Sequence, residues 1–257
     1  MKRMEDIYEK IAKKFGFPTR PPVHPDWLKA ELRRTGLSKN IKKPADVAPL
    51  IDHTMLKPEA SVREIIKLCD EAANFGFASV CVNPYWVSTA SIRLLDLPVM
   101  VCSVVGFPLG ANTTEIKTIE AKRVVDDGAS EIDMVINIGA LKSGSWEAVH
   151  ADISSVVEVS SPAPVKVILE TALLSEEEII YASLISRSAG AAFVKTSTGF
   201  SKGGATTEAV SLMTTAVGKY IGIKASGGIG DFESALAMVK AGATRIGSSK
   251  SIMIIGK

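Results

Sequence analysis

The stretch SAGAAFVKTSTGF, residues 188–200, contains a helix end, a short strand and a polar loop. Gly190 among small residues is typical of a helix C-terminus. Phe193 and Val194 then form a short apolar run that predicts a buried strand. Lys195 ends this run, in a place where a desolvated ammonium group is costly. The same order of helix end, strand and small-residue loop recurs along the chain, so this stretch represents the repeating unit of the fold.

Short runs rich in Val and Ile, typical of buried parallel strands, occur eight times after residue 46. They are VAPLIDHT (47–54), ASVCVNP (78–84), VMVCSVVGFP (99–108), EIDMVIN (131–137), VKVILET (165–171), AFVKTST (192–198), IGIKASGG (221–228) and TRIGSS (244–249). Amphipathic stretches lie between them. Two of these stretches open with a Ser-x-x-Glu capping pair, Ser61 with Glu64 and Ser175 with Glu178. Glycines mark the expected helix ends, at Gly76, Gly128, Gly190 and Gly242.

Eight strand–helix units predict an α/β protein with a (β/α)8 TIM barrel, a fold of typically about 250 residues. A doubly wound open sheet is the alternative, and it normally carries a Gly-rich nucleotide turn after its first strand. The segment IDHTMLKPEAS (51–61) contains no such turn. We therefore expect residues 46–257 to form one barrel catalytic domain.

The first 45 residues differ in charge from the rest of the chain. They carry twelve Lys/Arg and five Asp/Glu, a net of +7, whereas the remainder has a net charge of −5. Met4, Ile7, Ile11 and Phe15 fall at helical spacing, which predicts an amphipathic helix packed on the main domain. The Pro-rich FPTRPPVHPDW (17–27) predicts a linker or strap. Because no basic groove interleaved with aromatic residues follows, we expect a helical extension and no nucleic-acid binding.

The composition also narrows the cellular setting. No apolar run is long enough to span a bilayer, and the early acidic residues argue against a transit peptide. Cys69, Cys81 and Cys102 form no CxxC pair, which suits a reducing compartment. We expect a cytoplasmic protein with no membrane partner.

Two lysines and one aspartate are candidates for chemistry. Lys195 and Lys224 lie near the ends of two neighbouring strands, where barrels carry their catalytic residues. Adjacent strands are roughly 4.8 Å apart, so the two ammonium groups can influence each other. Burial and a nearby like charge both lower the pKa of a lysine, which favours a neutral, nucleophilic amine. Asp133, a carboxylate inside the apolar run EIDMVIN, is the expected proton-transfer group.

Three late loops have small residues whose backbone N–H groups can approach an anion: STGFSKGGAT (197–206), SGGIG (226–230) and GSSKS (247–251). Loops after strands seven and eight are a recurring phosphate site in this fold. His24, His53 and His150 are too scattered to indicate a metal site, so we expect no metal. Lys166 and Glu170 predict an internal ion pair or a substrate contact, and we favour the ion pair.

Several segments together resemble one family, the deoxyribose-phosphate aldolases, which are Schiff-base (class I) aldolases. The resemblance runs from about residue 47 to about 250 and rests on IDHTMLKPEA (51–60), VVGFPLGA (104–111), EIDMVINIGALKSG (131–144), FVKTSTGF (193–200) and KASGGI (224–229). It implies reversible cleavage of 2-deoxy-D-ribose 5-phosphate to D-glyceraldehyde 3-phosphate and acetaldehyde, with no metal or organic cofactor. It also implies a place in deoxyribonucleotide catabolism and a homo-oligomer, either a dimer or a tetramer.

The resemblance assigns roles to individual residues. It makes Lys195 the Schiff-base former, Lys224 the lysine that perturbs it and moves protons, and Asp133 the remaining proton-relay group. It implies phosphate binding at Gly199, Gly227, Gly228, Ser248 and Ser249, and a supporting polar role for Asp52 and Thr54.

The chain departs from the family pattern around the expected phosphate. Members commonly have an arginine after SGGI and often a lysine after STG, where this chain has Gly230 and Phe200. Lys202 is the expected substitute cation, since it lies three residues after Gly199. Lys250 occupies a position where a small residue is usual.

Two other functions remain open from the sequence. One is a Schiff-base barrel aldolase that acts on a longer phosphosugar or a keto acid, which product analysis would distinguish. The other is a phosphosugar-binding barrel without catalysis, which the presence of Lys195, Lys224 and Asp133 disfavours.

Overall fold

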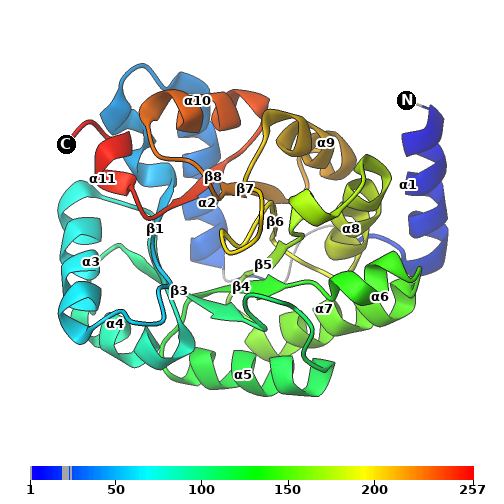
Figure 1. The fold of residues 1–257 in the computed structure, drawn as a ribbon, viewed down its shortest axis with the longest axis horizontal. Coiled ribbons are helices and arrows are strands. Elements are labelled where there is room, and N and C mark those ends of the chain that lie inside the picture. Colours follow the sequence, from blue (N-terminus) through cyan, green and yellow to red (C-terminus); the bar gives the residue numbers. More distant parts are fainter. Residues whose placement is uncertain (1, 19–22, 24) are drawn as a thin grey trace.

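The computed structural model describes residues 2–18, 23 and 25–257. Its centre is a closed barrel of parallel strands in the order β1 to β8, with β8 paired to β1 (Figure 1). The strands are β1 Ile51–Met55, β2 Ser79–Val82, β3 Met100–Val105, β4 Glu131–Val135, β5 Val165–Ile168, β6 Phe193–Lys195, β7 Gly222–Ser226 and β8 Arg245–Ser248. The predicted (β/α)8 barrel is confirmed.

Helices surround the barrel and connect its strands (Figure 1). They are α3 Val62–Phe75, α4 Val87–Arg93, α5 Thr114–Asp126, α6 Ile138–Lys142, α7 Trp146–Ser160, α8 Glu176–Ser188, α9 Thr207–Val217, α10 Phe232–Ala241 and α11 Ser251–Ile254. Short 3-10 helices are η1 Ser38–Asn40, η2 Pro44–Leu50, η3 Pro84–Trp86 and η4 Thr171–Leu173. Both predicted capping boxes form, at the starts of α3 and α8. Among the described residues, none of the helices has the length and apolarity that crossing a bilayer requires.

The first strand is shorter than predicted. Residues 47–50 belong to the 3-10 helix η2, and β1 begins only at Ile51. Pro49 lies in this segment and has no N–H to donate to a neighbouring strand, so it is a poor member of a central strand. The prediction of a strand from residue 47 was therefore wrong for its first four residues.

The two faces of the barrel strands differ in chemistry. In β4, Ile132 and Met134 pack into the apolar core, whereas the alternating Glu131 and Asp133 join buried ion pairs. Strand residues alternate between faces, so a single strand contributes apolar side chains to one face and charged side chains to the other. Barrel interiors are usually filled by branched apolar side chains. Here the interior contains a network of charged side chains.

Helix α1, Lys2–Phe15, packs against α8 at the edge of the barrel (Figure 1). Ile7 and Ile11 are buried, and Met4 and Phe15 pack against the same apolar core. The amphipathic spacing of the sequence thus corresponds to an observed helix.

A second helix, α2 (Pro25–Leu37), was not predicted. The Pro-rich composition of residues 17–27 predicted a linker or strap instead. Residues 19–22 and 24 of that linker lie outside the described part, and from Pro25 the chain is helical. Proline is favoured in the first turn of a helix, so its presence there is no obstacle. Trp27 packs against Phe193, the first residue of β6, which places α2 across the N-terminal ends of the strands, behind the barrel in Figure 1.

Candidate active site

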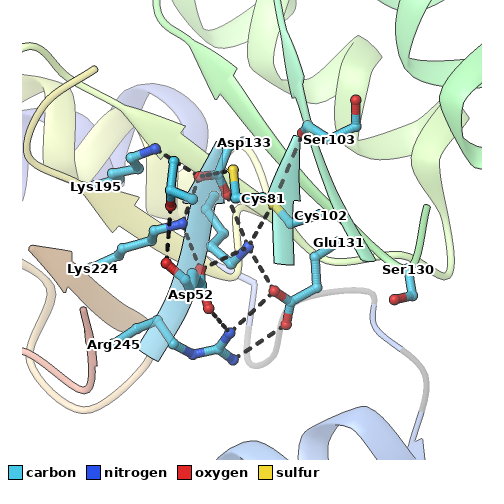
Figure 2. A network of polar contacts seen from close by, with 12 residues as sticks. Asp52, Cys81, Cys102, Ser103, Ser130, Glu131, Asp133, Lys195, Lys224 and Arg245 are labelled. Carbon is cyan, nitrogen blue, oxygen red and sulfur yellow. Dashed lines mark hydrogen bonds and ion pairs between the residues drawn. The ribbon is translucent and has the colours of Figure 1, made fainter. Parts of the chain in front are cut away.

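Asp133 is the centre of the polar network inside the barrel (Figure 2). Its Oδ2 accepts hydrogen bonds from Lys195 Nζ and Lys224 Nζ, each at 2.7 Å. Its Oδ1 accepts one from Lys166 Nζ at 2.9 Å. The structure therefore brings the three predicted catalytic residues into direct contact and adds a third lysine that the sequence analysis assigned to a structural pair.

Strand register explains why Lys195 and Lys224 meet at one carboxylate. They are direct partners on the adjacent parallel strands β6 and β7, so their side chains leave the same face side by side. Gly247, on the next strand, has no side chain on this face. A Cβ atom there would lie 3.0 Å from Lys224 Cε, so the glycine leaves room for the lysine.

Burial and charge act in opposite directions on these groups. Burial alone would raise the pKa of Asp133, but the ammonium groups of Lys166, Lys195 and Lys224 outweigh it and hold that pKa well below its usual value. Burial alone would lower the pKa of Lys224, but the carboxylates of Asp133 and Asp52 outweigh it and raise that pKa. The expectation that burial and like charge depress a lysine pKa is therefore wrong for Lys224, which stays an ammonium ion.

Asp52 links the lysines to the opposite end of the barrel. Its Oδ2 lies 2.5 Å from Lys224 Nζ, and its Oδ1 accepts a hydrogen bond from Arg245 Nη1 at 2.7 Å. Thr54 Oγ1 donates to the backbone carbonyl of Asp52 at 2.9 Å. The supporting role predicted for Asp52 and Thr54 thus corresponds to specific contacts.

Two further charged residues, Glu131 and Arg245, were missed in the sequence. Glu131 pairs with Lys166 at 2.7 Å and accepts hydrogen bonds from both terminal nitrogens of Arg245. Its position two residues before Asp133, on the same strand face, was a usable signal.

The predicted ion pair between Lys166 and Glu170 is not formed. Lys166 pairs with Glu131 and Asp133 on the adjacent strand β4 and with Asp52 on β1, across the barrel. Glu170 instead accepts hydrogen bonds from the N–H and the hydroxyl of Thr198. Glu170 thus binds the loop that follows β6 through two hydrogen bonds.

A cavity of about 450 Å³ opens at the C-terminal ends of β1, β6, β7 and β8. Lys195 lines it, together with the other predicted cavity residues Thr54, Gly199, Gly227, Gly228, Ser248 and Ser249. Gly199, Gly227 and Gly228 have φ values of 85°, 88° and 79°, a conformation that favours glycine. Loops of this kind expose consecutive N–H groups that can bind an anion.

Besides Lys195, the cavity is lined by Lys57 and Lys250, and not by the predicted Lys202. Lys250 lines the cavity wall, whereas Lys202 is exposed and is not among the lining residues. A Cβ atom on Gly230 would lie 3.2 Å from Lys250 Cδ, so Lys250 passes directly over the position where the family commonly has arginine. The placement does not support Lys202 as the substitute cation.

The thiols of Cys81 and Cys102 lie beside Asp133, close enough together for a metal site. Both Asp133 oxygens, however, are already bound by lysine ammonium groups, and a divalent cation would face three positive charges. Burial also raises the pKa of the Cys102 thiol well above its usual value, which disfavours the thiolate that a metal requires. The donor set does not fit a metal ion.

A larger cavity, about 1000 Å³, lies at the other end of the barrel beside α2 and is lined by residues such as Trp27 and Tyr220. In this fold catalysis takes place at the C-terminal ends of the strands. The smaller cavity, which contains Lys195, is therefore the candidate active site.

A family model described as DeoC/LacD family aldolase matches residues 47–254. The chain belongs to this family. Among curated relatives, deoxyribose-phosphate aldolase of Geobacillus sp. (strain WCH70) is 56% identical over 211 residues, covering 82% of this chain and 95% of the relative. The enzyme of the same name from Thermococcus gammatolerans is 55% identical over 214 residues, with coverages of 82% and 95%.

Solved structures give the DeoC/LacD aldolase assignment a second basis. The structure of a Coccidioides immitis protein assigned as deoxyribose-phosphate aldolase superposes with a TM-score of 0.83 at 37% identity, covering 99% of this chain and 96% of that one. The Aeropyrum pernix deoxyribose phosphate aldolase, described as a tetramer, gives a TM-score of 0.79 at 35% identity, with coverages of 88% and 96%. Sequence and fold therefore agree that the chain is an aldolase.

Proposed function

We propose that this aldolase reversibly cleaves 2-deoxy-D-ribose 5-phosphate to D-glyceraldehyde 3-phosphate and acetaldehyde through a Schiff base on Lys195. One observation carries the assignment of the nucleophile. Of the three lysines bound to Asp133, Lys195 lines the cavity, while Lys166 and Lys224 are fully buried behind it.

The first step is addition of the Lys195 amine to C1 of the open-chain aldehyde. The amine must be neutral to attack, and Asp133 Oδ2, 2.7 Å away, is the acceptor placed to take its proton. Loss of water from the carbinolamine needs a proton for the departing hydroxyl. Lys224, an ammonium bonded to the same oxygen, is placed to supply it.

The second step breaks the bond between C2 and C3. Its electron pair moves into the iminium and forms an enamine on Lys195, while the C3 hydroxyl proton passes to a base and glyceraldehyde 3-phosphate leaves. The enamine is then protonated at C2, and water hydrolyses the resulting iminium to release acetaldehyde. Asp133 and Lys224 form the acid–base pair nearest to these transfers.

We place the substrate phosphate at the glycine-rich end of the cavity. Gly199, Gly227 and Gly228 supply backbone N–H groups there, and Lys250 supplies a positive charge. The Aeropyrum pernix relative, which is described as a tetramer, supports a homo-oligomer, and we propose that this protein works in the cytoplasm, as expected from the sequence.

Borohydride reduction in the presence of acetaldehyde tests the proposal. We expect one ethyl group on Lys195 by peptide mapping, no labelling in Lys195→Met, and glyceraldehyde 3-phosphate as a product from deoxyribose 5-phosphate. Labelling at Lys166 or Lys224 would contradict the assignment of the nucleophile. Cleavage of a longer phosphosugar or a keto acid in preference would favour a different Schiff-base aldolase.

A further inference from the structure

Helix α2 contributes two side chains to the floor of the charged network. Glu31 Oε2 accepts a hydrogen bond from Arg245 Nη2 at 2.5 Å, and Trp27 Nε1 donates to Glu131 Oε1 at 2.6 Å. The Arg245 side chain is 0% exposed and that of Glu31 is 9% exposed. Both contacts are thus withdrawn from water, at the end of the barrel opposite to the substrate cavity.

A continuous series of ion pairs connects Glu31 with Lys195 (Figure 2 shows it from Arg245 onward). Arg245 binds Asp52 at 2.7 Å, and Asp52 binds Lys224 at 2.5 Å. Lys224 and Lys195 then share Asp133 Oδ2, each at 2.7 Å. A change of charge at Glu31 therefore reaches the nucleophile through groups in direct contact.

The eight buried groups of the network carry equal numbers of negative and positive charges when Glu31 is counted. Its carboxylates are Glu31, Asp52, Glu131 and Asp133, and its cations are Lys166, Lys195, Lys224 and Arg245. In a buried site charges act over longer distances than in water, and removing one partner leaves the other uncompensated. Arg34 also approaches Glu31 Oε2, at 3.4 Å with its side chain 13% exposed, and adds a positive charge at the edge of the network.

The Glu31–Arg245 contact is poorly explained as a device for stability alone. Glu31 Oε1 and Arg245 Nε are buried without a hydrogen-bond partner in the part of the chain that the structure describes. Replacing a buried ion pair with apolar side chains is often neutral or stabilising. Glu31 does supply a negative charge next to the charged network. It belongs to α2, a helix that precedes residues 47–254, the segment that the family model matches.

We propose that Glu31 is a positioning residue of the aldolase, which acts through Arg245 to set the charge of the network that binds Lys195. Trp27 acts on the same network through Glu131. The N-terminal extension is thereby part of the catalytic apparatus without touching substrate. This inference rests on the proposed function, in which Lys195 forms the Schiff base.

Two substitutions that change the network in opposite senses test the proposal. Glu31→Gln removes a negative charge and nearly preserves shape, so the network should lose protons more easily. The acid limb of the kcat/KM profile for deoxyribose 5-phosphate should move to lower pH by several tenths of a unit. Trp27→Phe removes a hydrogen-bond donor from Glu131 and leaves its negative charge less neutralised. The same limb should then move to higher pH.

Two controls separate this role from a structural one. Glu9→Gln removes an exposed carboxylate from α1, for which no ion pair occurs among the described residues, and should leave the profile unchanged. Glu31→Asp keeps the charge and should stay near the wild-type profile. Thermal unfolding of each variant reports loss of α2 packing.

The proposal would be overturned if Glu31→Gln and Trp27→Phe both lowered Tm but left the pH profile unchanged. It would also be overturned if these two variants shifted the acid limb in the same direction, or if Glu31→Asp shifted it as far as Glu31→Gln. If Glu31→Gln does not fold, the profiles of Trp27→Phe and Glu31→Asp decide the matter. Borohydride trapping on wild-type protein accompanies the series. Failure there would count against the Schiff-base assignment instead, so the two failures are distinguishable.

Discussion

The clearest test of the substrate-binding end of the cavity is Lys250→Gln. Lys250 lines the cavity together with the positive-φ glycines, whereas Lys202, in the loop after β6, does not. Glutamine retains most of the length of the side chain and can still donate a hydrogen bond, but it removes the positive charge. The substitution therefore isolates the charge of Lys250, which lines the cavity together with the two other departures from the family pattern, Phe200 and Gly230.

The magnitude follows from the contact that is lost. A hydrogen bond to a charged group contributes about 1.5–3 kcal/mol, and solvent screening of an exposed lysine reduces this contribution to about 1–2 kcal/mol. A loss of about 1–2 kcal/mol corresponds to roughly a 5- to 30-fold rise in KM for deoxyribose 5-phosphate. Because the phosphate is bound equally in ground and transition states, kcat should change little.

Steady-state kinetics on phosphorylated and unphosphorylated deoxyribose provide the assay, with Lys202→Gln as the matched control. We expect Lys250→Gln to raise KM for the phosphorylated sugar alone and Lys202→Gln to leave both sugars near wild type. An equal loss for the two sugars, or a larger effect from Lys202→Gln, would refute the placement of the phosphate beside Lys250.

Three further predictions concern the network and the extension. Lys224→Met should lower kcat by about 100-fold or more, since a buried proton donor is lost, while circular dichroism should show a retained fold. The free energy of unfolding should fall below about pH 4, because Asp133 and Asp52 have lowered pKa values when folded, and their contribution is lost as the carboxylates are protonated. A constant Tm between pH 7 and pH 3 would contradict this. Deleting residues 1–45 should lower Tm, since it exposes Glu131 and Arg245 and leaves them partly unpaired; an unchanged Tm would mean that the extension is independent of the barrel.

Local sequence patterns were sufficient for the barrel and for the three central residues of the site. Asp133 stood out as a carboxylate inside the apolar run EIDMVIN, and strand ends placed Lys195 and Lys224 at neighbouring positions. These inferences need only residues that are close in sequence. The raised pKa of Lys224 could not be predicted in this way, because it depends on the carboxylates of Asp133 and Asp52, which come from β4 and β1, far away in the sequence.

The parts that sequence reasoning missed depend on pairs that are far apart in the chain. Glu131 and Arg245 are 114 residues apart, and Glu31 and Arg245 are 214 apart, so no local window contains both partners. Helix α2 was missed for a local reason. Its first residue is the last proline of a Pro-rich segment, which reads as a linker although proline also suits the first turn of a helix.

The network also explains how three similar lysines can have different roles. Lys166 is paired with three carboxylates (Asp52, Glu131 and Asp133), and Lys224 is paired with two (Asp52 and Asp133). In the described part of the chain, Lys195 is paired with Asp133 alone, and of the three lysines it is the one that lines the cavity. The number of paired carboxylates therefore falls from three to one toward the cavity. The carboxylates of β1 and β4 thus hold Lys166 and Lys224 in several buried ion pairs, whereas the proposed nucleophile, Lys195, shares only Asp133 with them among the described residues.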